Sequence, residues 1–243
     1  MTRALAFLYG VFCYLLFLVT FLYAIGFVGG FGVPTSLDSP AAGPFGEALL
    51  VDALLLGLFA AQHSVMARPA FKRWWTRWVP AAVERSTYVL ASSLALILLF
   101  WQWRPLGGTI WQVDNAVGAA LLWALCALGW LIVLSGTFLI NHFDLVGLRQ
   151  VWLNLRQRPC PPVGFTSRGY YRFVRHPLML GFIIAFWASP HMTLSHLLFA
   201  LASTLYIVLA LRFEEHDLAA SLGEPYRDYQ RHVRMLLPLP RRP

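Results

Sequence analysis

Long uncharged runs dominate the pattern of hydrophobic and polar residues along this chain. Residues 4–28, 87–103 and 115–140 contain no charged side chain, and residues 48–67 contain only Asp52. A helix needs roughly 20 mainly apolar residues to cross a bilayer, with a range of about 17 to 25. The pattern therefore predicts four membrane-spanning helices. The first is longer than the core of a signal peptide, so we expect it to be retained.

A fifth apolar region, at 178–212, is interrupted by Ser189-Pro190-His191. As a helix, residues 178–189 would extend about 18 Å, which is too short for a hydrocarbon core of about 30 Å. Residues 195–214 would extend about 30 Å and are long enough to cross it. The pattern predicts a helical hairpin with a short arm and a spanning arm. The tip of the short arm must be sheltered by protein.

A polar segment near the C-terminus completes the expected architecture. Residues 224–233 predict a short amphipathic helix, and Gly223 before them is suited to end the preceding helix. The predicted fold class is all-α: a polytopic membrane helix bundle of about five transmembrane helices, one short broken helix and a cytoplasmic C-terminal amphipathic helix. We expect a single membrane domain over 1–243, with its parts at 1–140 (a four-helix scaffold), 141–177 (a cytoplasmic loop), 178–214 (the hairpin) and 215–243 (a cytoplasmic C-terminal segment).

Composition and charge support a membrane protein and exclude several other classes. Of the 243 residues, 58% are hydrophobic and 12% are charged, against about 25% charged in soluble domains. The net charge of +8 is concentrated after the second and fourth runs and near the C-terminus. By the positive-inside rule both termini face the cytoplasm, here of a bacterial inner membrane. We expect contact with the lipid bilayer, but neither nucleic acid nor an obligate protein partner. Cys13, Cys126 and Cys160 lack metal-binding spacing, so we expect free thiols and no metal.

Polar residues near the inner ends of two predicted spans are candidates for chemistry. Ionisable groups at membrane depth usually face the bundle interior. Gln62 and His63 either satisfy helix ends and neighbouring backbone groups or line a site. His142 and Asp144 lie close together, and a carboxylate beside an imidazole raises its basicity or fixes its tautomer. The alternative is an Asx-type helix cap at Asn141 or Asp144, with an exposed histidine.

The segment Arg175-His176-Pro177 stands where the short arm of the hairpin begins. Proline is favoured as the first residue of a helix. A helix N-terminus has free N–H groups and a positive dipole, so this end suits an anionic or polar ligand group. The hairpin brings Glu214 and Glu215 back to the same side. These acids either complete a ligand site or simply pair with arginines at the surface.

Taken together, these motifs resemble a known family. The succession of Arg175-His176-Pro177, a hairpin, Glu214-Glu215 and the stretch 223–229 is similar to the isoprenylcysteine carboxyl methyltransferase-like and NnrU-like membrane methyltransferases. More narrowly, segments 61–69, 141–145 and 175–182 resemble the bacterial methanethiol S-methyltransferases. The resemblance implies S-adenosylmethionine bound on the cytoplasmic side of the hairpin. The residues that match cofactor positions are Tyr171, His176, Pro177, Leu178, Met179 and Glu214, with 163–166, including Phe165 and Thr166, as a looser match.

One departure from the superfamily bears on the acceptor. Members that act on prenylated cysteine have an arginine one helical turn before the first glutamate, where this chain has Ala210. Because alanine cannot pair with a carboxylate, the resemblance favours a small neutral thiol, methanethiol, with dimethyl sulfide as the product. The alternatives are a related membrane methyltransferase acting on another lipophilic thiol or an isoprenylcysteine carboxylate, and a non-catalytic channel or assembly protein.

A thiol acceptor must lose its proton, so a base or a cationic stabiliser is needed. His142 with Asp144 is our first candidate for the base, and His63 is the second. Arg175 or His176 is a candidate to stabilise the thiolate.

Overall fold

The computed structural model describes residues 1–161 and 164–238. Val163 of the expected cofactor loop and the last five residues of the expected C-terminal segment lie outside this part of the chain. Contacts divide the chain into two compact units, 1–108 with 141–163 and 109–140 with 164–243. The organisation as a single domain stays a prediction.

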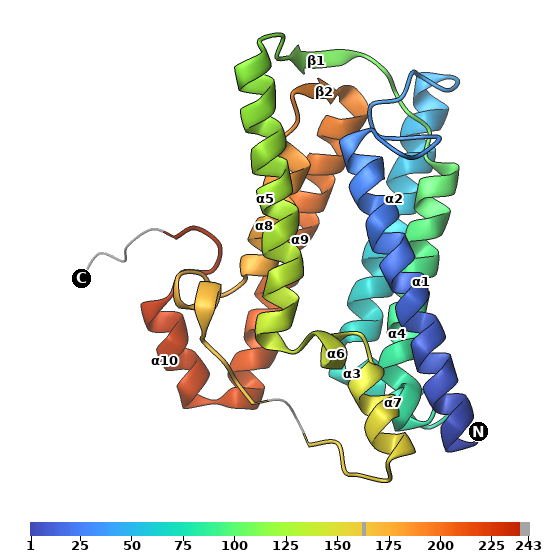
Figure 1. Ribbon diagram of the computed structural model, residues 1–243, viewed down its shortest axis with the longest axis vertical. Coiled ribbons are helices and arrows are strands. Elements are labelled where there is room, and N and C mark those ends of the chain that lie inside the picture. The colour runs from blue at the N-terminus through green and yellow to red at the C-terminus, as the bar shows by residue number, and fades with distance from the viewer. Residues whose placement is uncertain (162–163, 239–243) are drawn as a thin grey trace. The chain divides into compact units, whose positions relative to one another are not determined.

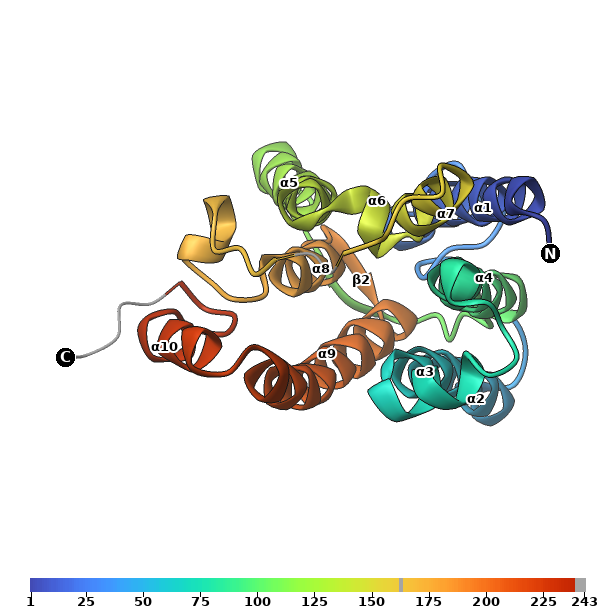
Figure 2. The ribbon, with the colours of Figure 1, turned by 90° about the horizontal axis from the view of Figure 1, so that it is seen from below.

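The first unit combines three long helices with three short ones. These are α1 (Arg3–Gly29), α2 (Phe45–Ala67), α3 (Pro69–Trp75), α4 (Ala81–Gln102), α6 (His142–Leu145) and α7 (Leu148–Leu155). Within this unit α4 packs against both α1 and α2, and α7 packs against α1 and α4 (Figures 1 and 2). The unit therefore joins the first three predicted spans to the segment that carries His142.

Two glycines allow the close approach of α7 in the first unit. A Cβ atom at Gly10 would lie 2.5 Å from Cγ2 of Val151, which is fully buried. Gly147 has a φ of +88°, and a Cβ there would lie 2.6 Å from the Ser86 hydroxyl. Glycine is favoured at both positions because a side chain would push α7 away.

The second unit contains the hairpin. Its elements are β1 (Thr109–Gln112), α5 (Ala116–Ile140), η1 (Gly169–Arg172), α8 (Pro177–Trp187), β2 (His191–Thr193), α9 (Leu194–Leu222) and α10 (Glu224–His232). Here α8 packs along α5 and also contacts α9, while α10 contacts the end of α9 (Figure 1). The predicted short arm, break and long arm are confirmed. The long arm continues past the predicted limit at residue 214.

The tip of the hairpin is covered by a strand pair that the sequence analysis did not predict. β1 pairs antiparallel with β2, with Thr109 opposite Thr193 and an irregular register before Trp111. The Trp111 indole donates to the Ser189 carbonyl at 3.0 Å, and a backbone N–H from the segment after β1 donates to Pro190 at 2.8 Å. The polar backbone at the break thus finds partners within the protein, in line with the expectation that protein shelters the tip.

Glycines also set the contact between α5 and α8. A Cβ at Gly129 would lie 2.7 Å from the backbone nitrogen of Ala185, and a Cβ at Gly181 would lie 2.7 Å from the Gly129 carbonyl. The two backbones therefore meet without intervening side chains. Small residues of this kind are common at contacts between membrane helices.

Within residues 1–161 and 164–238, five helices, α1, α2, α4, α5 and α9, are long and apolar enough to cross a membrane, whereas α8 is an apolar helix of only 11 residues. The predicted class, a mostly helical polytopic membrane protein with a short broken helix, is confirmed. The short strand pair departs from an all-α description.

Candidate functional site

The carboxylate of Glu215, on α9, is the centre of a buried polar junction in the second unit. The Arg175 guanidinium donates to both of its oxygens, from Nε at 2.8 Å and from Nη2 at 2.7 Å. Nε2 of His176 lies 2.6 Å from Oε1. The Tyr226 hydroxyl and the Gln230 amide donate to the same carboxylate at 2.8 and 2.7 Å. These contacts satisfy both carboxylate oxygens and offset the cost of burying the charge.

Backbone pairing holds the basic residues of this junction in place. The N–H of Arg175 donates to the Arg234 carbonyl at 2.8 Å, and that of His176 to the Met235 carbonyl at 3.1 Å. Nη1 of Arg175 also donates to the carbonyl of Val233. The junction therefore ties together the segment before α8, the end of α9 and the segment after α10.

The structure confirms that the two ends of the hairpin meet, but it changes which acid meets the basic residues. Successive helical residues point about 100° apart, so neighbouring acids occupy different faces. Glu215 makes the buried contacts, whereas Glu214, which matches a cofactor position, is exposed. The alternative to a ligand site in the sequence analysis was simple Arg–Glu pairing at the surface. Glu215 does pair with an arginine, but the pair is buried. Since Nε, Nη1 and Nη2 of Arg175 all have protein partners, the geometry favours a positioning role for it over the predicted stabilisation of a thiolate.

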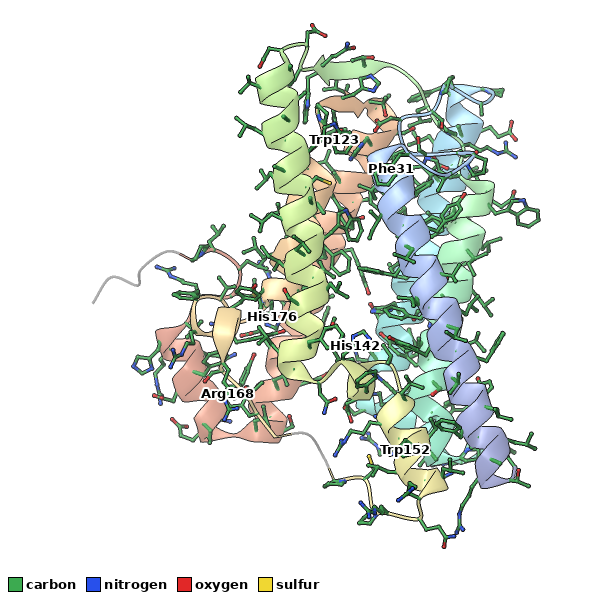
Figure 3. The ribbon with its side chains drawn as sticks, viewed as in Figure 1. Phe31, Trp123, His142, Trp152, Arg168 and His176 are labelled. Atoms are coloured by element: carbon green, nitrogen blue, oxygen red, sulfur yellow. The ribbon has the colours of Figure 1, made fainter. Side chains whose placement is uncertain are left out.

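The predicted cofactor residues lie on the segment that leads into α8. Figure 3 shows Arg168 and His176 on this segment. Pro177 is the first residue of α8 and is buried, and Leu178 and Met179 follow it, half-buried, in the first turn. Thr166 is half-buried in the extended chain before η1.

Tyr171 stands out among these residues because its hydroxyl is buried and has no hydrogen-bond partner within 1–161 and 164–238. Burial raises the pKa of Tyr171, and the nearby Tyr229 and Glu214 add to the increase, so the phenol stays protonated. The Tyr229 hydroxyl donates to the Tyr171 carbonyl at 2.5 Å. The Phe165 ring meets the Tyr229 ring edge-on at 5.1 Å. A buried polar atom usually has a partner, so this hydroxyl is suited to a ligand contact.

His142, in the first unit, is 5% exposed and lies in the turn of α6 (Figure 3). Its Nε2 is 3.2 Å from the Tyr14 hydroxyl, and the two rings meet edge-on at 5.7 Å. Burial lowers the pKa of His142, which favours the neutral imidazole at pH 7.

The Asp144 carboxylate has partners other than His142, and the pairing of these two side chains stays a prediction. The Asp144 carboxylate accepts from Arg149 at 2.7 Å and from Gln150 at 3.2 Å. The Asn141 side chain accepts from the Asp144 N–H at 3.2 Å, so the alternative of an Asx-type cap is confirmed. That alternative also expected an exposed histidine, and this part is wrong because the cap buries the ring.

His63, on α2, contacts side chains of α4. The interpretation that His63 satisfies helix ends or neighbouring backbone groups is not supported by these contacts. The Tyr88 hydroxyl lies 2.8 Å from Nε2 of His63, and the Ser92 hydroxyl lies 3.1 Å from Nδ1. The Arg85 guanidinium lies 5.0 Å from the centre of the Tyr88 ring. The contacts of His63 thus form a polar network between two membrane helices, and its predicted role as a second candidate base stays a prediction.

Sequence reasoning missed the tyrosines that contact these groups. Tyr14 and Tyr88 lie in apolar helices, and Tyr226 was recognised only as part of an amphipathic helix. The available signal was general: a buried tyrosine hydroxyl usually finds a hydrogen-bond partner. This signal does not identify a partner that is distant in sequence. Tyr14 and His142, for example, are 128 positions apart.

Fold and site together define a polytopic helical membrane protein with an Arg–His–Glu–Tyr junction at the base of a short broken helix. The chain belongs to the NnrU protein family, whose model matches residues 51–235. This confirms the family to which the sequence motifs pointed.

Three relatives are similar to the chain over most of its length. It is 58% identical to a methanethiol S-methyltransferase of Mycobacterium tuberculosis, covering 100% of this chain and 99% of the relative. It is 54% identical to a methanethiol S-methyltransferase of Crocosphaera subtropica, covering 98% and 93%. It is 55% identical to methanethiol S-methyltransferase 2 of Bradyrhizobium diazoefficiens, covering 95% and 89%. No solved structure matches the chain.

Proposed function

We propose that this protein methylates methanethiol to dimethyl sulfide, with S-adenosylmethionine as the methyl donor. The observation that carries the proposal is the identity of 54 to 58% to three relatives named for methanethiol S-methylation, aligned over nearly the whole chain. Ala210 adds support from the site, because α9 offers no arginine at the position that would pair with a prenylcysteine carboxylate.

Residues of the second unit fit the methyl donor. When bound, S-adenosylmethionine supplies an electrophilic methyl group on a sulfonium. The Tyr171 hydroxyl is buried and unpartnered within the described residues, so it has a hydrogen bond to offer. The exposed Glu214 carboxylate is close enough to influence Tyr171 and is suited to a cationic or hydroxyl group of the ligand. The ring of Phe165 suits attraction between a cation and an aromatic face.

The Glu215 junction would serve this site by holding it rigid. It fixes His176 and the start of α8 to α9 and α10 through charge-assisted hydrogen bonds, which are stronger than neutral ones. Methyl transfer is an in-line displacement, for which orientation supplies on the order of 7–11 kcal/mol. Arg175 and His176 therefore act here as residues that position the segment carrying Tyr171.

His142 remains our first candidate for the base that takes the proton of the acceptor thiol. An unperturbed cysteine thiol has a pKa of about 8.5, so only a small fraction of such a thiol is ionised at neutral pH. His142 is buried and its pKa is lowered, so it is available as a neutral base. His63 remains the second candidate.

The site would open to the cytoplasm of a bacterial cell. This orientation places both termini on the cytoplasmic side, in agreement with the positions of the basic residues under the positive-inside rule. It gives the donor a route from the aqueous side, while a small apolar thiol reaches the protein from either water or lipid.

Membranes containing the protein test the proposal when they are given methanethiol and S-adenosylmethionine labelled in its methyl group. Labelled dimethyl sulfide is expected in the headspace, and membranes without the protein provide the control. Labelled product from a prenylcysteine, and none from methanethiol, would replace this function with its closest alternative. Failure of the purified protein to bind S-adenosylmethionine would favour a non-catalytic membrane protein.

A further inference from the structure

Tyr229, on α10, contacts two of the residues proposed to meet the methyl donor. Its hydroxyl donates to the Tyr171 carbonyl at 2.5 Å, and its ring meets the Phe165 ring edge-on at 5.1 Å. The side chain of Tyr229 is only 9% exposed, so these contacts are shielded from water. A single side chain thus joins α10 to η1 and to the extended chain before it.

The contact with Tyr229 gives the Tyr171 carbonyl a partner near the end of the short helix η1. The backbone N–H groups of Phe173 and Val174 both donate to the Tyr170 carbonyl, so neither of them serves Tyr171. The last carbonyls of a helix lack partners within the helix, and a carbonyl that is buried without a partner is costly. The Tyr229 hydroxyl therefore holds the backbone of Tyr171 in place.

The polar groups of Tyr171 differ in how they are satisfied. Its N–H donates to the Arg168 carbonyl at 3.2 Å, and its carbonyl accepts from Tyr229. Its own hydroxyl is buried and has no hydrogen-bond partner within residues 1–161 and 164–238. Because the backbone is held on both sides of the side chain, the position of this hydroxyl is restricted. Tyr229 contributes to that restriction from a different helix.

The hydrogen bond from Tyr229 keeps one direction at neutral pH. A carbonyl only accepts, so the Tyr229 hydroxyl must supply the proton. Burial raises the pKa of Tyr229 to about 12, so its hydroxyl remains protonated. The contact with Tyr171 is therefore available wherever the enzyme would work.

Other residues of α10 hold this helix without help from the Tyr229 hydroxyl. The Tyr226 hydroxyl and the Gln230 amide donate to the Glu215 carboxylate at 2.8 and 2.7 Å. Loss of the Tyr229 hydroxyl alone should therefore leave α10 docked on α9. The effect of its loss should be confined to Tyr171.

We propose that Tyr229 is a positioning residue for the methyl donor, acting through Tyr171, whose hydroxyl it directs toward the ligand. The inference rests on the proposed methyl transfer and deepens it. The hydroxyl proton of Tyr229 is engaged by the Tyr171 carbonyl, so Tyr229 itself does not donate to the ligand. Removal of the Tyr229 hydroxyl should therefore weaken donor binding only while Tyr171 keeps its own hydroxyl.

A double-mutant cycle tests this dependence. Tyr229→Phe removes the hydroxyl and keeps the ring beside Phe165. The Kd for S-adenosylmethionine, measured by calorimetry in detergent, is expected to rise about fivefold, the effect of one hydrogen bond. In the Tyr171→Phe background, the same change should alter the Kd by less than about twofold. Equal effects in both backgrounds, or no effect in the wild-type background, would overturn the inference.

Tyr170→Phe is the matched control, because it removes an exposed hydroxyl from the same short helix. Its affinity for S-adenosylmethionine should match that of the wild type.

Steady-state kinetics separate positioning from general damage to the fold. In Tyr229→Phe the KM for S-adenosylmethionine should rise, while kcat at saturating donor and the KM for methanethiol stay close to wild type. A fall in kcat with an unchanged KM for the donor would contradict the inference. Failure of the wild type to bind S-adenosylmethionine would instead defeat the proposed function, and this inference with it.

Discussion

Glu215 and His142 are almost equally hidden from water, at 8% and 5% exposure, but their surroundings differ. Glu215 is surrounded by Arg175, His176, Tyr226 and Gln230, which together satisfy both carboxylate oxygens. Nε2 of His142 lies 3.2 Å from the Tyr14 hydroxyl. A buried charge with a complete set of partners is fixed in one protonation state. A buried neutral ring keeps the capacity to gain a proton. The arrangement around Glu215 suits a structural role, and the arrangement around His142 suits proton transfer.

The comparison predicts its largest effect at Glu215. Glu215→Ala leaves the Arg175 guanidinium buried without its counter-charge, and breaking such a pair costs about 3–5 kcal/mol. Unfolding in mixed detergent micelles measures the loss. Glu214→Ala is the matched control, because that side chain is exposed, and it should change stability little. Equal losses in the two variants would show that the junction is not the anchor described here.

The rigidity attributed to the second unit also depends on the contact between α5 and α8. In Gly129→Ala the new methyl group meets the Ala185 nitrogen and the Gly181 carbonyl at 2.7 Å, and overpacking of this kind costs about 1–3 kcal/mol. Gly57→Ala on α2 is the control, since nothing lies within 4 Å of a Cβ there. Glycine is about 0.5–1 kcal/mol less favourable than alanine within a helix, so the control should be neutral or stabilising. Thermal unfolding of both variants in the same detergent makes the comparison.

A variant at Glu214 tests ligand binding in the second unit separately from the stability of the fold. Glu214→Gln keeps the shape of the side chain but removes its charge, so we expect affinity for S-adenosylmethionine to fall about tenfold, equivalent to about 1.4 kcal/mol. Calorimetry in detergent measures the affinity, and unfolding under the same conditions should match the wild type. Unchanged affinity would remove Glu214 from the cofactor site while leaving the Glu215 junction untouched.

The smallest effect is a pH dependence of stability from His142. Its folded pKa is lowered by burial, so below the unfolded value of about 6.5 the unfolded chain binds the proton more readily. The stability that the neutral ring contributes is therefore present above pH 6.5 and decreases as the pH falls. His142→Gln should reduce this dependence, as measured by unfolding at pH 8 and at pH 5.5. An unchanged pH profile in the variant would indicate a histidine that titrates as if exposed.

The sequence predicted the helices and the hairpin well because a membrane imposes length and hydrophobicity directly on each segment. It could not decide between Glu214 and Glu215, since the choice depends on how α9 is rotated against its neighbours. The pattern of His142 and Asp144 did not reveal that Arg149 and Gln150 donate to the Asp144 carboxylate.

The strand pair was invisible to pattern reasoning for a different reason. β1 has four residues and β2 has three, too few for a periodic signal, and their pairing joins segments far apart in the chain. Tyr14 is a similar case, because a tyrosine in an apolar helix carries no information about its partner. In each of these cases tertiary packing, and not local pattern, supplied the missing information.

The pairing of β1 with β2 has a consequence for how the protein is made. β1 and α5 leave the ribosome before α8, so the strand that covers the hairpin tip is synthesised before the tip itself. A short helix that cannot span the bilayer alone thus arrives after its docking surface. A chain lacking β1 would leave the Ser189 carbonyl without the Trp111 indole as its partner. Such a nascent chain should be held longer by the insertion machinery and removed by membrane proteases.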